Sequence, residues 1–195
     1  MATTMAAHAP LAAPSPWVQR FAPLMPAGEV LDLACGSGRH ARLLAALGHP
    51  VLAVDRDPQA LAACAAPGIR TERHDLEDGA PWPYPGREFA GIVVANYLHR
   101  PLFDALFRAL APGGVLIYET FAAGNGRFGK PSNPDFLLRP GELLELAARF
   151  GGGMRIVAYE DGLVSQPKPA MVQRICVVRP ISGAEDEQGW PLQGE

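Results

Sequence analysis

The chain has 195 residues, a formal net charge of −3, 48% hydrophobic residues and 19% charged residues. This length is enough for one domain whose core needs neither a disulfide nor a metal. The composition is typical of a soluble globular protein, and no apolar run approaches the roughly 18 residues that a membrane helix requires. Basic residues are scattered along the chain, which disfavours nucleic acid as a partner.

The two ends of the chain differ in composition from its middle. Residues 1–14 have no basic segment and only a broken apolar run, so they predict a flexible terminus and not a signal peptide. Residues 181–195 are polar and acidic, and they predict a flexible tail. We expect residues 15–180 to form the single domain.

Three cysteines, Cys35, Cys64 and Cys176, are present, and their spacing matches neither a metal site nor a C-x-x-C motif. The spacing therefore predicts free thiols and no bound metal. Such cysteine usage is typical of a reducing compartment, so we expect a cytoplasmic protein.

Short β-branched apolar runs alternate with windows of helical periodicity along the chain. The runs predict strands at residues 29–35, 51–55, 69–74, 89–96, 115–120, 154–159 and 171–178. The helical windows cover residues 15–24, 38–48, 58–66, 101–111 and 141–150. This alternation predicts an α/β fold, a doubly wound Rossmann-like sheet of seven strands that are mostly parallel.

The strongest apolar run, residues 89–96, is expected to be buried on both faces and therefore central in the sheet. The last two strands are joined by about ten residues, too few for a parallel crossover. They therefore predict a C-terminal antiparallel hairpin.

Glycine and proline mark the expected helix ends. The helix over residues 38–48 is expected to bury Leu47 together with Leu44. The helix that begins at Pro101 is expected to be broken by the Pro-Gly-Gly of residues 112–114.

A glycine turn follows the first strand. Gly36, Gly38 and Ala41 fit the spacing G-x-G-x-x-G/A, and Asp55 follows Gly36 by 19 residues, which is the outline of a dinucleotide loop. However, Asp32 lies inside the preceding strand, where its carboxylate would repel a pyrophosphate. A ligand that carries an ammonium and a sulfonium fits this charge better than NAD does.

Four segments, DLACGSG, VLAVDRDP, HDLED and LAPGGVLI, occur in this order between residues 30 and 120. In order and spacing they resemble the class I S-adenosylmethionine-dependent methyltransferases. The resemblance implies that the turn holds the methionine part, that Asp55 binds both ribose hydroxyls, and that Asp75 binds the adenine amino group. The cofactor-binding residues that it implies are Asp32, Ala34, Gly36, Gly38, Asp55, Arg56, Asp75, Leu76 and Asn96.

Each acidic candidate also has a structural alternative. Asp32 could be satisfied by backbone N–H groups, but a carboxylate in an apolar strand requires a partner, which favours function. Asp75 lies beside Glu77 and Asp78, so a solvated loop acid is a serious alternative.

The segment after the fourth strand carries the catalytic candidates, His99 and Tyr97. His99 could act as a general base, although a hydrogen-bonded loop histidine is the more frequent case. Tyr97 and Trp17 could line the pocket or pack in the core. His40 and its neighbour Arg39 are expected to be surface groups.

The long segment over residues 121–138 lacks periodicity and is the candidate for acceptor selection, with a flexible glycine-rich lid as the alternative. Its polar side chains, two amides and two cations, suit a small anionic or polar acceptor: Asn125, Arg127, Lys130 and Asn133. The motif N-P-P-[YF] of base-amino methyltransferases is absent after the fourth strand. The size of the chain is similar to small-molecule members, including tellurite-resistance and thiol methyltransferases.

We therefore predict a methyltransferase that uses S-adenosylmethionine to methylate a small molecule by in-line displacement. Two alternatives remain open, an NAD-dependent oxidoreductase and a non-catalytic S-adenosylmethionine-binding regulatory protein. RNA or protein methylation is a third possibility, which a basic surface around residues 121–138 would favour.

Overall fold

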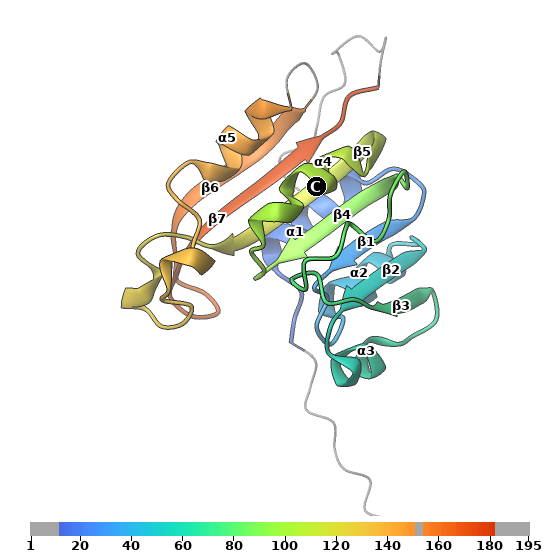
Figure 1. Cartoon of the computed structure of the whole chain (residues 1–195), viewed down its shortest axis with the longest axis horizontal. Helices are drawn as coiled ribbons and strands as arrows, with labels where there is room; N and C mark the ends of the chain where they lie inside the picture. Colours follow the sequence, from blue (N-terminus) through green and yellow to red (C-terminus); the bar gives the residue numbers. More distant parts are fainter. Residues whose placement is uncertain (1–11, 151–153, 182–195) are drawn as a thin grey trace, which may run out of the picture.

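The computed structural model describes residues 12–150 and 154–181. Its centre is a seven-stranded sheet with the order β3-β2-β1-β4-β5-β7-β6, shown in Figure 1. The strands are β1 Val30–Leu33, β2 Val51–Asp55, β3 Ile69–Arg73, β4 Phe89–Ala95, β5 Leu110–Phe121, β6 Arg155–Val164 and β7 Ala170–Val178. The predicted fold class is confirmed, because β1 to β5 pair in parallel and β7 is antiparallel to both β5 and β6.

The strand order reverses between β1 and β4, and β4 is the middle strand, as its apolar sequence predicts. The first crossovers leave β1 toward β2 and β3, whereas the chain then returns to the other side of β1. In open α/β sheets this reversal marks the ligand site at the carboxyl ends of the strands.

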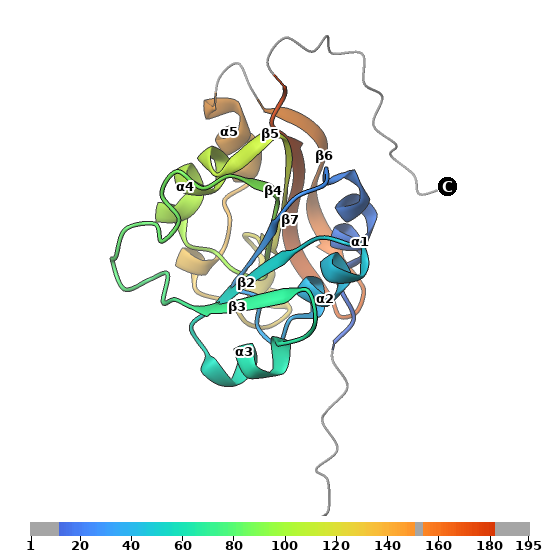
Figure 2. The same ribbon diagram turned by 90° about the vertical axis from the view of Figure 1, so that its right-hand side faces the viewer.

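Helices cover both faces of the sheet, as Figure 2 shows. One face packs against α1 Pro16–Phe21, α2 Arg39–Ala46 and α3 Pro58–Cys64. The other face packs against α4 Phe103–Arg108 and α5 Glu142–Arg149. Short 3-10 helices, η1 Ala22–Leu24, η2 Arg100–Leu102, η3 Asn125–Arg127 and η4 Pro134–Phe136, complete the regular structure. Side chains alternate along each strand between these two core layers.

The crossover from β3 to β4 has no helix. Instead, residues 74–88 cover the sheet with two aromatic side chains: the Tyr84 hydroxyl donates to Glu72 at 2.9 Å, and Trp82 Nε1 donates to the Tyr84 carbonyl at 3.1 Å. The Tyr84 ring also meets Phe89 edge-on, with centroids 5.9 Å apart. Aromatic packing therefore replaces a helix over this part of the apolar face.

Two boundary predictions were wrong. The helix α4 ends at Arg108, and residues 112–114 lie within β5, whose pairing with β4 shifts register between Phe89 and Gly91. A Cβ on Gly114 would lie 2.7 Å from the Ala111 carbonyl oxygen, so the Pro-Gly-Gly bends a strand and does not end a helix. Leu47 is 44% exposed, because α2 ends one residue before it.

At the termini the structure tests only part of the predictions. Ser15 caps α1 by accepting from the Trp17 N–H at 3.1 Å, in agreement with the predicted N-terminal helix. Most of the predicted flexible segments, residues 1–11 and 182–195, lie outside the described residues. No helix in the described part of the chain is long and apolar enough to cross a membrane.

Candidate active site

The glycine turn between β1 and α2 has three residues with left-handed backbone: Ala34 (φ 54°), Gly36 (φ 54°) and Gly38 (φ 83°). A Cβ added to Gly38 would lie 2.4 Å from the Cys64 sulfur, so only glycine fits there. An added Cβ on Gly36 would meet nothing within 4 Å. The turn is thus tightly packed against α3 at Gly38 and open at Gly36, where a ligand can approach its backbone.

Asp55, the last residue of β2, holds the turn from the side. Its Oδ2 accepts the Gly36 N–H at 2.8 Å, and its Oδ1 accepts the Asp57 N–H at 2.9 Å. Each carboxylate oxygen has two lone pairs, so one remains on each oxygen for a further donor. The structure therefore brings Asp55 and Gly36 together, as their spacing suggested.

Asp32 is buried in β1, with 1% of its surface exposed, and its Oδ2 has no hydrogen-bond partner. Burial raises its pKa to about 7, against the lowering effects of the Ala41 N–H and the Arg39 guanidinium, while the Asp55 charge raises it further. An isolated buried carboxylate is unfavourable, and a cation in the site would restore its charge. The orphaned oxygen beside the turn fits the ammonium of S-adenosylmethionine.

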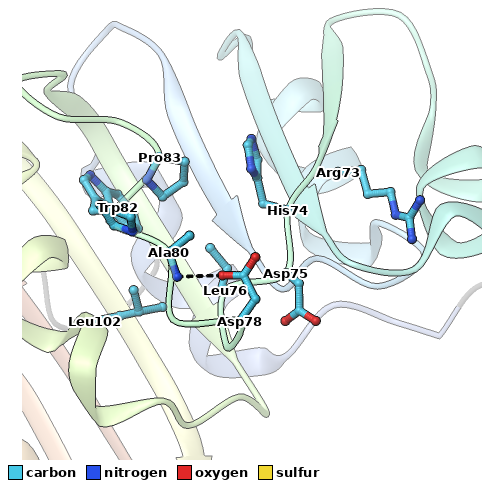
Figure 3. Close-up of a pocket in the computed structure, with 10 residues that line it drawn as sticks. Arg73, His74, Asp75, Leu76, Asp78, Ala80, Trp82, Pro83 and Leu102 are labelled. Atoms are coloured by element: carbon cyan, nitrogen blue, oxygen red, sulfur yellow. Dashed lines mark hydrogen bonds between the residues drawn. The ribbon is translucent and has the colours of Figure 1, made fainter.

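The segment after β3 lies beside a small cavity of about 190 Å³. Figure 3 shows Leu76 near Trp82 and Leu102, while the Asp75 carboxylate points away from Trp82. Asp75 is exposed, and its Oδ1 accepts the Glu77 N–H at 3.0 Å, which leaves Oδ2 for another donor.

Arg56, which follows β2, is exposed, and its carbonyl accepts from Arg73 Nε at 3.1 Å. This contact links the segment that follows β2 to the last residue of β3. The roles of Asp75, Leu76 and Arg56 toward a cofactor stay predictions.

Three candidates follow β4. Asn96 is exposed with a φ of 57°, and its N–H donates to the Glu119 carbonyl at 2.8 Å. The buried Tyr97 hydroxyl has no hydrogen-bond partner, and burial and the nearby Glu77 carboxylate raise the pKa of Tyr97. Tyr97 therefore stays protonated at neutral pH, so it cannot act as a general base, but its hydroxyl can donate a hydrogen bond. His99 is half-buried, and its catalytic role stays a prediction.

His40 is not a surface group, which corrects the expectation from sequence. It is 3% exposed, and its Nε2 accepts the Ser15 N–H at 3.1 Å, so it joins α2 to the start of α1. Burial lowers the pKa of His40 to about 4, with a further lowering by the Arg39 charge. The neutral imidazole is thus part of the packing between two helices, whereas Arg39 is half-exposed as a surface position would be.

Trp17 packs in the core and is 3% exposed. The Arg174 guanidinium lies 4.9 Å from its ring centroid and pairs with Glu119 at 3.2 Å and Glu160 at 2.6 Å. Arg174 and Glu119 are directly opposite each other on β7 and β5. This charged row was not foreseen, because Arg174 is 14 positions from Glu160 and 55 positions from Glu119 in sequence.

Residues 121–138 form a loop that is anchored by side-chain hydrogen bonds. Asn125 is 2% exposed; its Nδ2 donates to the Pro131 carbonyl at 2.9 Å, and its Oδ1 accepts the Met171 N–H at 3.1 Å. Asn133 caps η4 by accepting the Asp135 N–H at 3.1 Å. These two amides therefore hold the loop together, whereas Arg127 and Lys130 remain exposed.

Arg100 and Glu142 form a clamp that sequence analysis missed. Glu142 is 2% exposed and accepts from Arg100 Nε at 2.7 Å and Nη2 at 3.0 Å, and the same guanidinium donates to the carbonyls of Asp135 and Leu137. Burial opposes ionisation of Glu142, but the Arg100 and Arg139 hydrogen bonds outweigh it and lower the pKa. The sequence signal was present, since Glu142 lies on the same helical face as Leu146.

No group of three or more potential metal ligands occurs within residues 12–150 and 154–181.

Known proteins are similar to the part of the chain that contains the glycine turn and the strands around it. Residues 30–114 match a family model described as "Methyltransferase domain". A trans-aconitate 2-methyltransferase from Rhizobium meliloti is 39% identical over 105 residues, which are 50% of this chain and 40% of that protein. A ribosomal RNA small subunit methyltransferase H from Rippkaea orientalis is 39% identical over 87 residues, 42% of this chain and 29% of its own length. The chain thus spans less than half the length of these curated relatives.

The fold is also that of a solved structure. TehB from Haemophilus influenzae superimposes with a TM-score of 0.65 at 18% identity, over 84% of this chain and 61% of that one. At this identity the likeness shows the shared fold alone.

Proposed function

We propose that this chain, which has the fold and the methyltransferase domain of the class I S-adenosylmethionine-dependent methyltransferases, transfers a methyl group from that cofactor to a small-molecule acceptor. The observation that carries the proposal is the buried, unpartnered Asp32 oxygen in the strand that leads into the glycine turn, together with the open space at Gly36. A pyrophosphate at the same place would meet a carboxylate, whereas an ammonium would neutralise it.

In this proposal, different residues at the turn bind different parts of the cofactor. Asp32 and the backbone of Gly36 and Gly38 hold the methionine part, with Ala34 shaping the turn. Asp55 accepts from the ribose hydroxyls through its two remaining lone pairs, each charged hydrogen bond being worth roughly 1.5 to 3 kcal/mol.

The adenine lies between the segments that follow β2, β3 and β4. Arg56 and Leu76 flank it, Asp75 accepts from its amino group through the free Oδ2, and Asn96 closes this side. When bound, the cofactor supplies an activated sulfonium methyl group.

Catalysis in this arrangement requires the chain mainly to position the acceptor and to exclude water. Tyr97 supplies an O–H donor at the carboxyl end of β4, and His99 is the residue that could accept a proton from the acceptor. A soft anionic nucleophile needs no such base, and the His99 role therefore depends on the acceptor.

The small-molecule assignment is supported by the polar side chains of the loop over residues 121–138 and by the scatter of basic residues along the sequence. The matched family region ends at Gly114, before this loop, and its relatives include proteins named for trans-aconitate and for ribosomal RNA. The shared region therefore supports the cofactor, while the acceptor is set by residues outside it.

Calorimetry with S-adenosylhomocysteine and with NADH tests the cofactor assignment. We expect micromolar-range binding of S-adenosylhomocysteine and none of NADH. Binding of NADH alone would overturn the proposal. A screen of thiols, chalcogen oxyanions, amines, phenols and carboxylates with labelled methyl donor then identifies the acceptor, and cofactor binding without any transfer would favour a regulatory protein.

A further inference from the structure

A cavity of about 420 Å³ lies in the loop that follows β5. Most of its lining is apolar side chain or glycine, including Gly124, Pro134, Leu137 and Leu138. Its volume is within the range of sites that hold small organic ligands.

Charge in this cavity has one sign. The lining contains Arg127 and Arg139 and no acidic residue. Arg139 is partly neutralised, since its guanidinium lies 3.5 Å from Glu142 and 3.7 Å from Glu145. No carboxylate of the described residues pairs with Arg127, whose Nε donates to the Gly124 carbonyl at 3.4 Å. A full positive charge therefore faces an apolar cavity.

Two exposed aromatic rings belong to the same loop. Phe128 is 40% exposed and Phe136 is 51% exposed, and the Arg127 guanidinium lies 5.8 Å from the Phe128 ring centroid. Exposed apolar side chains beside an apolar cavity are typical of ligand-binding surfaces.

Hydrogen bonds to other segments hold the walls of the cavity in place, and one of them comes from the segment that follows β4. Asn125 holds one wall through Pro131 and Met171. Arg100, three residues after Tyr97, holds the other wall by donating to the Leu137 carbonyl at 2.9 Å. The wall of the cavity at Leu137 is thus anchored to the segment that carries the catalytic candidates.

We propose that this cavity binds a small organic anion with an apolar body, whose carboxylate or similar group pairs with Arg127 while the body contacts Leu137, Leu138 and Pro134. As the acceptor subsite, this inference rests on the proposed function and gives its acceptor a chemical class. An amine of the same shape is excluded by the arginines, and a neutral amide lacks the ion pair.

The test uses three ligands with the same apolar body: phenylacetate, phenylacetamide and phenethylamine. Each is titrated into the full chain with S-adenosylhomocysteine present. We expect phenylacetate to bind about tenfold more tightly than phenylacetamide and phenethylamine not to bind. Arg127→Gln should reduce phenylacetate binding to the level of the amide, whereas Arg108→Gln, an exposed arginine on α4, should change nothing.

A second pair of variants localises the ligand. Ser132→Phe fills the cavity from its exposed wall and should abolish phenylacetate binding, while Ser165→Phe, exposed between β6 and β7, should not. Equal or tighter binding of the amide or amine, no binding of phenylacetate, or an unchanged Arg127→Gln variant would each overturn the proposal.

The two proposals fail in different ways. If S-adenosylhomocysteine binds and an uncharged acceptor is methylated without phenylacetate binding, the anion site is wrong and the methyltransferase stands. If S-adenosylhomocysteine does not bind but phenylacetate binds in an Arg127-dependent way, the anion site stands and the proposed function is wrong.

Discussion

The glycine turn and the loop over residues 121–140 lie at the same edge of the sheet but are built in opposite ways. The turn is fixed by neighbours at strand ends: Asp55 accepts from Gly36, and Asp32 lies in the strand that leads into the turn. The loop is fixed by distant partners, Arg100 and Met171, that reach it from other elements.

The difference extends to their electrostatics. Next to the turn, one oxygen of the buried Asp32 carboxylate has no hydrogen-bond partner, which a ligand can satisfy. Beside the loop, the buried carboxylate of Glu142, the first residue of α5, is paired with Arg100 and Arg139, whereas the exposed Arg127 of the loop has no carboxylate partner among the described residues. A cationic cofactor and an anionic second ligand are the natural complements of these two regions.

The largest expected effect concerns Asp32. Its pKa is about 7 in the folded chain and 3.8 in the unfolded one, so stability is full below pH 3.8 and falls as pH rises through 7. The loss amounts to about 4 kcal/mol at 1.36 kcal/mol per pKa unit. Asp32→Asn should abolish this loss and be more stable than the parent at pH 8, measured by urea unfolding, while binding S-adenosylhomocysteine less tightly. Equal pH profiles for both proteins would show that Asp32 carries no such penalty.

In the loop region, Arg100→Met should destabilise the chain by about 3 kcal/mol, because the buried Glu142 keeps only the weaker ion pair with the exposed Arg139, at 3.5 Å. The N–H of Arg139 still donates to Glu142, which keeps the effect at the lower end of the range. Chemical denaturation measures this change, with Arg108→Met as a matched control on exposed surface. If the two variants were equally stable, the clamp would contribute nothing to the fold.

Asp55→Ala tests whether residues at the glycine turn, and not His99, determine cofactor affinity. Loss of the ribose contacts should weaken S-adenosylhomocysteine binding roughly a hundredfold, about 2.7 kcal/mol. His99→Ala should leave that affinity nearly unchanged in the same calorimetric titration, since His99 is assigned to the acceptor. Equal losses in both variants would contradict the division of the site into two regions.

The smallest effect is expected at His40, which joins α2, the helix after the glycine turn, to the start of α1. Its pKa is about 4 in the folded chain and 6.5 in the unfolded one, so the stability it contributes is present above pH 6.5 and lost as pH falls toward 4. At pH 5 the loss should be about 2 kcal/mol. His40→Gln, which keeps an acceptor for the Ser15 N–H, should show a flatter stability profile between pH 7 and 5. A profile as steep as that of the parent would place the pH dependence elsewhere.

Local periodicity was sufficient to predict the seven strands, the central position of β4 and the C-terminal hairpin. Burial of a strand on one or both faces imposes a pattern on neighbouring residues, and this pattern can be read from the sequence. It failed at Leu47 and at Pro112, where the outcome depends on where a helix stops and on a register shift against β4. Neither is encoded within a few residues.

The sequence by itself determined the α/β architecture and the glycine turn with its acidic strand ends, since both follow from spacing along the chain. Only the tertiary structure decided that His40 is buried, that Asn125 supports the loop, and that Arg100 pairs with Glu142. These contacts join residues 25 to 46 positions apart, and only packing brings their polar atoms within hydrogen-bond distance.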